Sequence, residues 1–256
     1  MINCSSSIRY AIFLGSLVFL SGLLLSCRSI SQSGIGLPQS QVILSFDDGP
    51  NCVDDSTIKL LDVLEKYQIH SMFVILGVNA EQNPDLVRRI YEDGHCIINH
   101  GYSDKWNCWM RKNEFRENLL KGEAAIAAAL GTGYTEKLYR PHGGFYRRSQ
   151  EKIWIHEGYS FVPGSIRIFD AVRSGENQDW VLKKVITKTE KNKGGIILLH
   201  DTINSYSLTQ SKIEKKPNGP FNRLWIPGTV EKIITTLLEE GYYFDNSISQ
   251  LAEVRD

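Results

Sequence analysis

The sequence predicts an α/β fold with a parallel sheet or barrel, because short apolar runs typical of buried strands alternate with amphipathic segments typical of helices. Polar motifs come directly after several of the apolar runs. In such folds ligands meet the loops at the C-terminal ends of the strands, so we expect the functional residues there. The predicted helices span residues 56–67, 85–93, 113–130, 149–157, 180–191 and 229–240.

The first motif consists of Asp47 and Asp48, which end the strand predicted over residues 41–46. The Gly49-Pro50 pair that follows predicts a turn. Two adjacent carboxylates either hold a cation or raise the pKa of one of them, and a hydrolytic metal site uses one acid as ligand and the other as base. The alternative is a solvated turn in which an aspartate caps the next helix.

The second motif follows the apolar run at residues 96–98 and contains His100 and, four residues later, Asp104. Imidazole and carboxylate groups are both metal ligands. If this segment coils into a turn, positions four apart share a face. We therefore expect His100 and Asp104 to converge on one ion with Asp48.

Further strand-like runs lead into Arg140, Asp170 and His200. Asp179 is an alternative to Asp170 as the acid that follows the second of these runs. We favour Asp170 because it directly follows an apolar run, whereas Asp179 opens a helix and is readily explained as an N-terminal cap. The three runs span residues 137–139, 165–169 and 195–199.

Taken in order, these motifs resemble those of the polysaccharide deacetylases, the NodB-homology domain of the family-four carbohydrate esterases. The resemblance covers residues 41–251 and implies a single distorted, seven-stranded (β/α) barrel. The sequence departs from the commoner pattern at Asp104, where that pattern has a second histidine; a carboxylate keeps a donor atom, so metal binding is expected with an altered metal preference. By similarity, the implied roles are general base for Asp47, orientation of that base for Arg140, general acid for His200 paired with Asp170, lining of the acetyl pocket for Leu198, and metal ligation by Asp48, His100 and Asp104.

The resemblance implies metal-dependent hydrolysis of N-acetyl groups from a glycan that contains N-acetylglucosamine, with release of acetate. One divalent ion is expected, Zn²⁺ first, with Co²⁺ or another first-row metal as the alternative. Peptidoglycan is favoured over chitin-like or poly-N-acetylglucosamine chains. The alternative functions are an O-acetyl esterase acting on hemicellulose and a non-catalytic glycan-binding lipoprotein. Trp106 and Trp109 are expected either to stack on sugar rings or to pack within their own loop.

The N-terminus resembles a lipoprotein signal peptide. Arg9 precedes an apolar stretch over residues 11–25, which is shorter than the roughly 20 residues needed to span a bilayer. We expect residues 1–26 to be removed and Cys27 to carry lipid, at the start of a flexible Ser- and Gly-rich linker over residues 27–40. The alternative is an uncleaved anchor. Both interpretations place the domain outside the cytoplasm on a bacterial membrane, at its periplasmic or cell-surface face.

Charge and length exclude some classes of function. The chain has 29 Lys and Arg against 29 Asp and Glu, so its formal net charge of zero gives no general attraction to nucleic acid, and no nucleic-acid partner is expected. The length after residue 40 suits one catalytic domain, which we expect to be monomeric. Among the cysteines, Cys52, Cys96 and Cys108 remain after the N-terminal segment, and a Cys96–Cys108 pairing stays open.

Overall fold

The core of the molecule is a curled parallel sheet. The computed structural model describes residues 27–30, 37–51, 53–131, 134, 136–202 and 222–244. Seven strands pair in the order β7–β5–β4–β3–β2–β9–β8, and an eighth, β10 (Tyr243–Phe244), pairs with the start of β2. The strands of the ordered path are β2 (Gln41–Asp47), β3 (Met72–Ile75), β4 (Cys96–Asn99), β5 (Leu138–Tyr139), β7 (Ser160–Phe161), β8 (Ile166–Arg167) and β9 (Gly195–His200).

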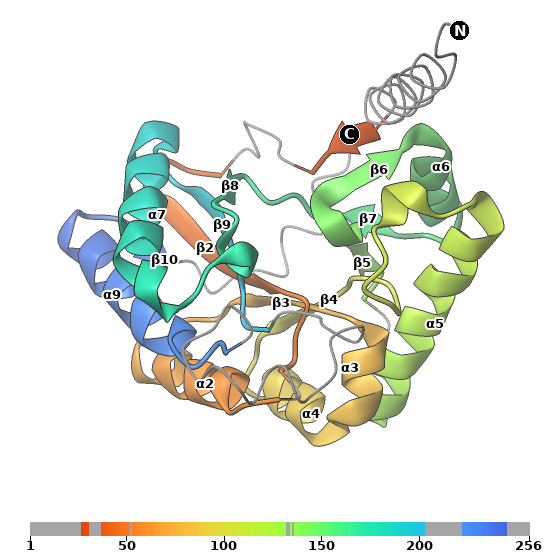
Figure 1. Ribbon diagram of the computed structural model, residues 1–256, viewed down its shortest axis with the longest axis horizontal. Helices are drawn as coiled ribbons and strands as arrows, with labels where there is room; N and C mark the ends of the chain where they lie inside the picture. The colour runs from red at the N-terminus through yellow and green to blue at the C-terminus, as the bar shows by residue number, and fades with distance from the viewer. Residues whose placement is uncertain are drawn as a thin grey trace, which may run out of the picture.

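Helices cover the outer face of this sheet (Figure 1). They agree with the predicted helical ranges to within three residues at each end, and α3 is an addition to them. The α-helices are α2 (Ser56–Lys66), α3 (Gly77–Gln82), α4 (Pro84–Glu92), α5 (Lys112–Leu130), α6 (Arg148–His156), α7 (Gln178–Asn192) and α9 (Ile226–Glu239), and the short 3-10 turns are η1 (Asn107–Trp109), η2 (His142–Gly144), η3 (Asp170–Val172) and η4 (Gly175–Asn177).

Strand alternation separates the two faces of the sheet. Val42, Leu44 and Phe46 of β2 belong to the large core under the helices, whereas Ile43 belongs to a separate cluster that fills the concave side. Because side chains two apart on a strand share a face, Ser45 and Asp47 lie on the same concave side as Ile43. Apolar side chains therefore fill the concave side of the sheet near the N-terminal ends of the strands. Polar side chains lie on this side at the C-terminal ends of the strands.

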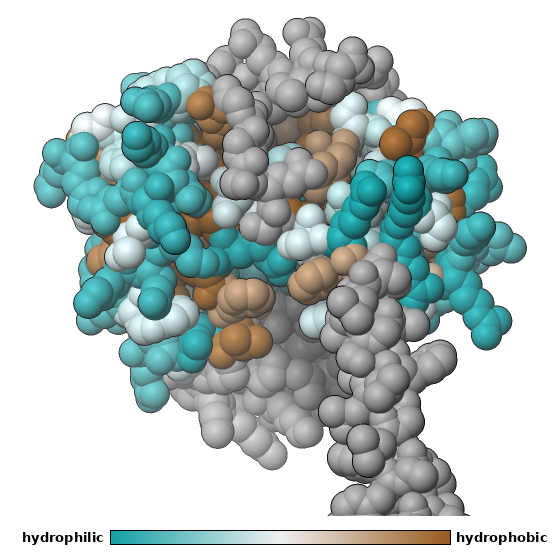
Figure 2. All heavy atoms as spheres, turned by 90° about the horizontal axis from the view of Figure 1, so that it is seen from above, coloured by the Kyte–Doolittle hydropathy of each residue, from teal (hydrophilic) through white to brown (hydrophobic). Residues whose placement is uncertain are grey.

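The two edges of the sheet, β7 and β8, are separated by only four residues of chain. A sheet whose edge strands are consecutive in sequence must curl until its edges approach each other, which makes it an incomplete barrel. This confirms the expected distorted seven-stranded (β/α) barrel. Figure 2 views the molecule from above, where hydrophilic residues cover both flanks and several hydrophobic residues lie between them.

Residues 27–30 are docked on the domain. Cys27–Ser29 forms β1, which pairs antiparallel with β6 (Phe145–Arg147). Ile30 is 1% exposed within an aromatic cluster, donates its N–H to Gly144 O at 3.1 Å and accepts from Gly164 N at 3.3 Å. Within the linker expected over residues 27–40, an apolar side chain and two backbone hydrogen bonds therefore hold Ile30 against the domain.

Other expectations for the N-terminal region lie outside the described residues. The signal peptide expected over residues 1–26 is one of them, and residues 31–36 of the linker are another. Within the described part of the chain, no helix is long and apolar enough to cross a membrane. Cys96 and Cys108 are free cysteines, so the pairing left open above is not formed.

Candidate active site

The adjacent aspartates reach the same side of the sheet through a break in strand geometry. Successive residues of a strand point to opposite faces, so Asp47 and Asp48 would normally diverge. Asp48 instead adopts the left-handed conformation with φ +73°, which ends the strand and turns its side chain toward the concave side. Its carbonyl oxygen accepts a hydrogen bond from Asn79 Nδ2 at 2.7 Å, which holds this turn in place.

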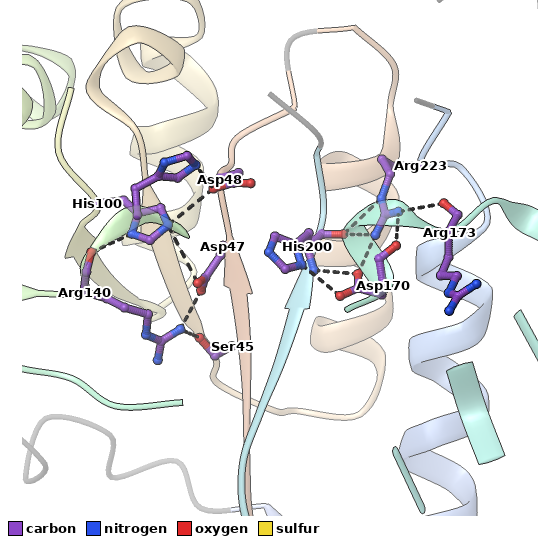
Figure 3. Close-up of polar contacts among 10 residues, drawn as sticks. Ser45, Asp47, Asp48, His100, Arg140, Asp170, Arg173, His200 and Arg223 are labelled. Atoms are coloured by element: carbon purple, nitrogen blue, oxygen red, sulfur yellow. Dashed lines mark hydrogen bonds and ion pairs between the residues drawn. The ribbon is translucent and has the colours of Figure 1, made fainter. Parts of the chain in front are cut away.

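Three buried side chains form a cluster suited to a cation. Ligand atoms of Asp48, His100 and His142 all lie within 4.8 Å of one another. The Nε2 atoms of His100 and His142 are each 3.3 Å from Asp48 Oδ1. Figure 3 shows the contact between His100 and Asp48. Burial by itself would raise the pKa of Asp48, but the neighbouring His142 and His100 hold that pKa well below its ordinary value. Asp48 is therefore ionised.

The orientation of His100 supports metal binding. Its Nδ1 lies 2.6 Å from the carbonyl oxygen of Arg140. A carbonyl oxygen only accepts hydrogen bonds, so Nδ1 carries the proton, and in the neutral ring the lone pair is on Nε2, facing Asp48. Asp48 Oδ1 is itself buried and accepts no hydrogen bond. Acceptor atoms that face one another in a buried site fit a bound cation, because a cation removes their mutual repulsion.

The third member of this cluster differs from the sequence prediction. Asp104 was expected to join Asp48 and His100, but His142 takes this place, and Asp104 is outside the cluster. The physical reason is local: residues 102–105 form bends and not a helical turn, so positions four apart do not share a face. His142 comes from η2, which follows β5.

Arg140 fixes the other carboxylate of the first motif. This arginine is fully buried, and its Nη1 donates to Asp47 Oδ1 and to Ser45 Oγ, each at 2.5 Å. Its Nε and Nη2 donate to the carbonyl oxygens of Val162 and Pro163. Asp47 Oδ2 stays on the side of the cluster, 3.8 Å from His100 Nε2. One oxygen of Asp47 is thus anchored, and the other faces the space in which a ligand would bind.

A second polar group lies on the opposite side of this space. His200 Nδ1 is 2.8 Å from Asp170 Oδ1, and the His200 backbone N–H donates to Asp170 Oδ2 at 3.0 Å. The exposed Asp179 lies on α7, with Lys232 Nζ 4.0 Å from its carboxylate. The geometry therefore pairs Asp170 with His200. Burial by itself would lower the pKa of His200, but Asp170 raises it to about 9.

Arg223 completes this group and was missed by the sequence reasoning. It is fully buried, and its Nη2 donates to Asp170 Oδ2 at 2.5 Å and to the carbonyl oxygen of His200 at 2.7 Å. Its Nη1 donates to the carbonyl oxygen of Asp170 at 3.1 Å. Although burial would raise the pKa of Asp170, His200 and Arg223 lower it. No local pattern marks Arg223, because it lies 53 residues after Asp170 and just before α9.

Asp201 supports the turn that carries Asp48. It is fully buried, and its carboxylate accepts a hydrogen bond from Thr57 Oγ1. Burial raises the pKa of Asp201 to about 7. A Cβ added to Gly49 would lie 2.6 Å from Asp201 Oδ1, so a glycine is needed at this point of the turn. The sequence predicted no role for Asp201.

Comparison with known proteins identifies relatives of this chain by sequence. The sequence profile of the polysaccharide deacetylase family matches residues 35–162. A peptidoglycan-N-acetylglucosamine deacetylase of Bacillus cereus is 32% identical over 64% of this chain and 57% of its own length. A chitooligosaccharide deacetylase of Sinorhizobium fredii is 29% identical over 68% of this chain and 77% of its own length.

A solved structure also resembles the chain. It is a family 4 acetyl xylan esterase from Clostridium thermocellum in complex with a cobalt ion, with a TM-score of 0.61 and 27% identity over 80% of this chain and 87% of that one. The chain thus spans little more than half of the Bacillus cereus relative and most of the esterase structure.

Proposed function

Since this chain belongs to the polysaccharide deacetylase family, we propose that it is a metal-dependent hydrolase that removes N-acetyl groups from an N-acetylglucosamine-containing glycan and releases acetate. One observation carries the proposal. Three ligand residues that could hold a cation, a carboxylate anchored by an arginine and a histidine paired with a second carboxylate all face the same end of the barrel.

The ion is proposed to be Zn²⁺, with Co²⁺ or another first-row metal as the alternative. Two imidazole nitrogens and one carboxylate oxygen form a donor set that suits zinc and leaves a coordination position open. Asp48, His100 and His142 would hold it. When bound there, a divalent ion supplies Lewis-acid chemistry, lowering the pKa of a water and polarising a carbonyl oxygen.

Asp47 is proposed as the general base. Its Oδ1 accepts the hydrogen bond from Arg140, which fixes the carboxylate in direction, and its Oδ2 is the oxygen that would accept a proton from the attacking water.

His200 is proposed as the general acid. Its Nδ1 is engaged by Asp170, so Nε2 is the nitrogen that would donate a proton to the departing amine. Its side chain is 17% exposed, against 2% for His100, which gives it the access to substrate that a proton donor needs. Leu198, two residues earlier on the same face of β9, would line the pocket for the acetyl methyl group.

The proposed substrate is peptidoglycan in the cell envelope. The Bacillus cereus relative, which acts on peptidoglycan, supports this choice, and the Sinorhizobium fredii relative supports a chitin-like oligosaccharide as the competing substrate. The proposed location is the outer side of a bacterial membrane, with a lipid on Cys27 and a monomeric catalytic domain. In that case the short path from Cys27 to the docked Ile30 would hold the domain close to the membrane surface.

One observation favours a second candidate function. The Clostridium thermocellum structure, an acetyl xylan esterase, matches 80% of this chain. An O-acetyl esterase would use the same base and ion but would leave an alcohol in place of an amine. The two functions differ in the product and not in the fold, so the product must be measured.

The test uses the full-length chain in detergent, loaded with zinc. We expect acetate release from N-acetylglucosamine oligomers and from peptidoglycan, with one free amine formed per acetate. Asp47→Asn is the control, because it keeps the ligand set and removes the base. Acetate from acetylated xylan alone would favour the esterase, and no acetate from any substrate at full metal occupancy would contradict both enzymatic functions.

A further inference from the structure

A third inward-facing arginine, Arg167, lies beside the proposed acetyl pocket. Arg167 on β8 is in register with Leu198 on β9. Register partners in a parallel pair point to the same face, and Leu198 shares its face with His200 two residues later. Arg167 therefore faces the concave side of the barrel, in the same layer as the pocket and one strand farther toward the sheet edge.

The guanidinium of Arg167 occupies a cradle built by its neighbours. Its Cζ is 5.6 Å from the ring centroid of Phe145 and 5.2 Å from that of Phe169, so it is within cation–π distance of both aromatic rings. A Cβ added to Gly144 would lie 2.5 Å from Arg167 Nη2. The guanidinium therefore lies against Gly144, which is two residues after the cluster member His142.

Arg167 differs from the other two arginines in having no carboxylate partner. Arg140 and Arg223 are fully buried and each donates to an aspartate at 2.5 Å. Across the residues that the structure describes, no carboxylate oxygen lies within 4.0 Å of the Arg167 guanidinium, which is partly buried. Burial of a cation without an ion-pair partner is costly: burial lowers the pKa of Arg167, and the charge of the more distant Asp47 offsets this only in part. Hydroxyl groups would satisfy its donors without neutralising its charge.

An exposed aromatic surface extends from this cradle. The Phe145 ring lies 6.4 Å from Trp106, which in turn lies 5.8 Å from Trp109. Trp106, Trp109 and Phe169 are 45%, 55% and 61% exposed. A Cβ at Gly143 would lie 2.7 Å from Trp106 Cγ, so this tryptophan covers the residue directly after His142. Exposed rings of this kind suit several consecutive sugars.

From these contacts we infer that Arg167 binds a carboxylate on a sugar next to the one that is deacetylated, so that the preferred substrate is an acidic N-acetylglucosamine glycan and not a neutral homopolymer. The inference rests on the proposed function and narrows its substrate class. A guanidinium presents a planar set of donors that matches a carboxylate in two parallel hydrogen bonds. The lactyl ether of muramic acid carries such a carboxylate wherever no stem peptide is attached to it, whereas chitin oligomers carry none.

The test compares two tetrasaccharides with the full-length, zinc-loaded chain. One is chitotetraose, and the other alternates N-acetylglucosamine with N-acetylmuramic acid whose lactyl carboxylates are free. We expect wild-type kcat/KM to be higher for the acidic one, and Arg167→Gln to lower kcat/KM for it by about 10–100-fold, the scale of a hydrogen bond to a charged group. The loss for chitotetraose should be smaller, because chitotetraose feels only the removal of the Arg167 charge near Asp47 and loses no hydrogen bond to a carboxylate.

Matched variants separate this role from a structural one. Arg116→Gln removes an exposed arginine on α5 and should leave both substrates unaffected. Arg167→Lys keeps the charge without the planar fork and should retain part of the preference. An equal loss on both tetrasaccharides, or a wild type without preference, would overturn the inference.

Binding distinguishes failure of the inference from failure of the proposed function. The two tetrasaccharides are titrated calorimetrically into Asp47→Asn, with and without Arg167→Gln. A selective loss of affinity for the acidic tetrasaccharide supports the carboxylate site even if no acetate is released. Unchanged affinity for it overturns the site whether or not the wild type is active.

Discussion

The two halves of the site are held together in opposite ways (Figure 3). Asp48, His100 and His142 turn their ligand atoms toward one another, and Asp48 Oδ1 accepts no hydrogen bond. In the other half, Asp170 is saturated: its side chain and carbonyl oxygens accept hydrogen bonds from His200, Arg223 and Arg173. The ligand half (Asp48, His100 and His142) therefore needs a cation to satisfy its buried acceptor atoms. The acid half (His200, Asp170 and Arg223) has its hydrogen bonds satisfied by its own members and is complete by itself.

This difference predicts that one substitution can abolish metal binding, and that another can impair the general acid while the metal stays bound. The largest effect is expected from His142→Ala. Removal of a ligand should lower metal affinity by more than about 100-fold. Mutation of a residue that only orients a ligand already lowers metal affinity by roughly 10–100-fold. Metal content after dialysis and acetate release measure it, and both should fall together.

Asp104→Ala is the matched control for His142→Ala. Asp104 is partly exposed and outside the cluster, so this variant should keep its metal and change activity by less than about 3-fold. The opposite result, with metal lost from Asp104→Ala and kept by His142→Ala, would restore the ligand set expected from the sequence.

The second prediction concerns the acid half and its pH dependence. Burial lowers the pKa of His200, but Asp170 raises it from 6.5 to about 9. His200 is therefore protonated and able to donate below about pH 9, and kcat should fall as the pH rises through that value. In Asp170→Asn the negative charge that raises the pKa of His200 is lost, whereas the burial that lowers this pKa remains. The fall in kcat at alkaline pH should therefore begin at lower pH.

The size of the Asp170→Asn effect on kcat at neutral pH should be about 100-fold, within the range of general acid catalysis. Metal content should remain unchanged, which distinguishes this variant from His142→Ala. Asp179→Asn is the control and should keep the wild-type profile, since Asp179 is exposed on α7. If kcat of Asp170→Asn falls at the same alkaline pH as that of the wild type, the assignment of His200 as the general acid is wrong.

The same contrast explains which parts of the site the sequence could predict. Asp47, Asp48, Arg140 and His200 directly follow or end their strands, and strand ends converge by topology alone. Asp170 was preferred over Asp179 for the same reason, and the structure places it against His200. Most helices were predicted closely because their apolar periodicity is local.

The remaining residues required information that local pattern does not contain. The spacing from His100 to Asp104 was interpreted as a turn, but residues 102–105 form bends. His142 did carry a signal, since it lies two residues after Arg140 in a motif that follows a strand. Arg223 carried none, because a buried ion pair between segments 53 residues apart depends on how the chain folds back.

The last prediction tests whether the acid half is complete by itself, and it concerns the stability of Arg223→Met. Removing one partner of a buried ion pair leaves Asp170 less compensated and should lower the free energy of unfolding by about 3–5 kcal/mol. Arg116→Met breaks an exposed pair with Glu157 and should cost less than about 1 kcal/mol. Urea unfolding of the metal-free and metal-loaded forms measures both. If Arg223 stabilises only the acid half, its effect should be the same in the two forms; an effect that appears only with metal bound would show that the two halves are coupled.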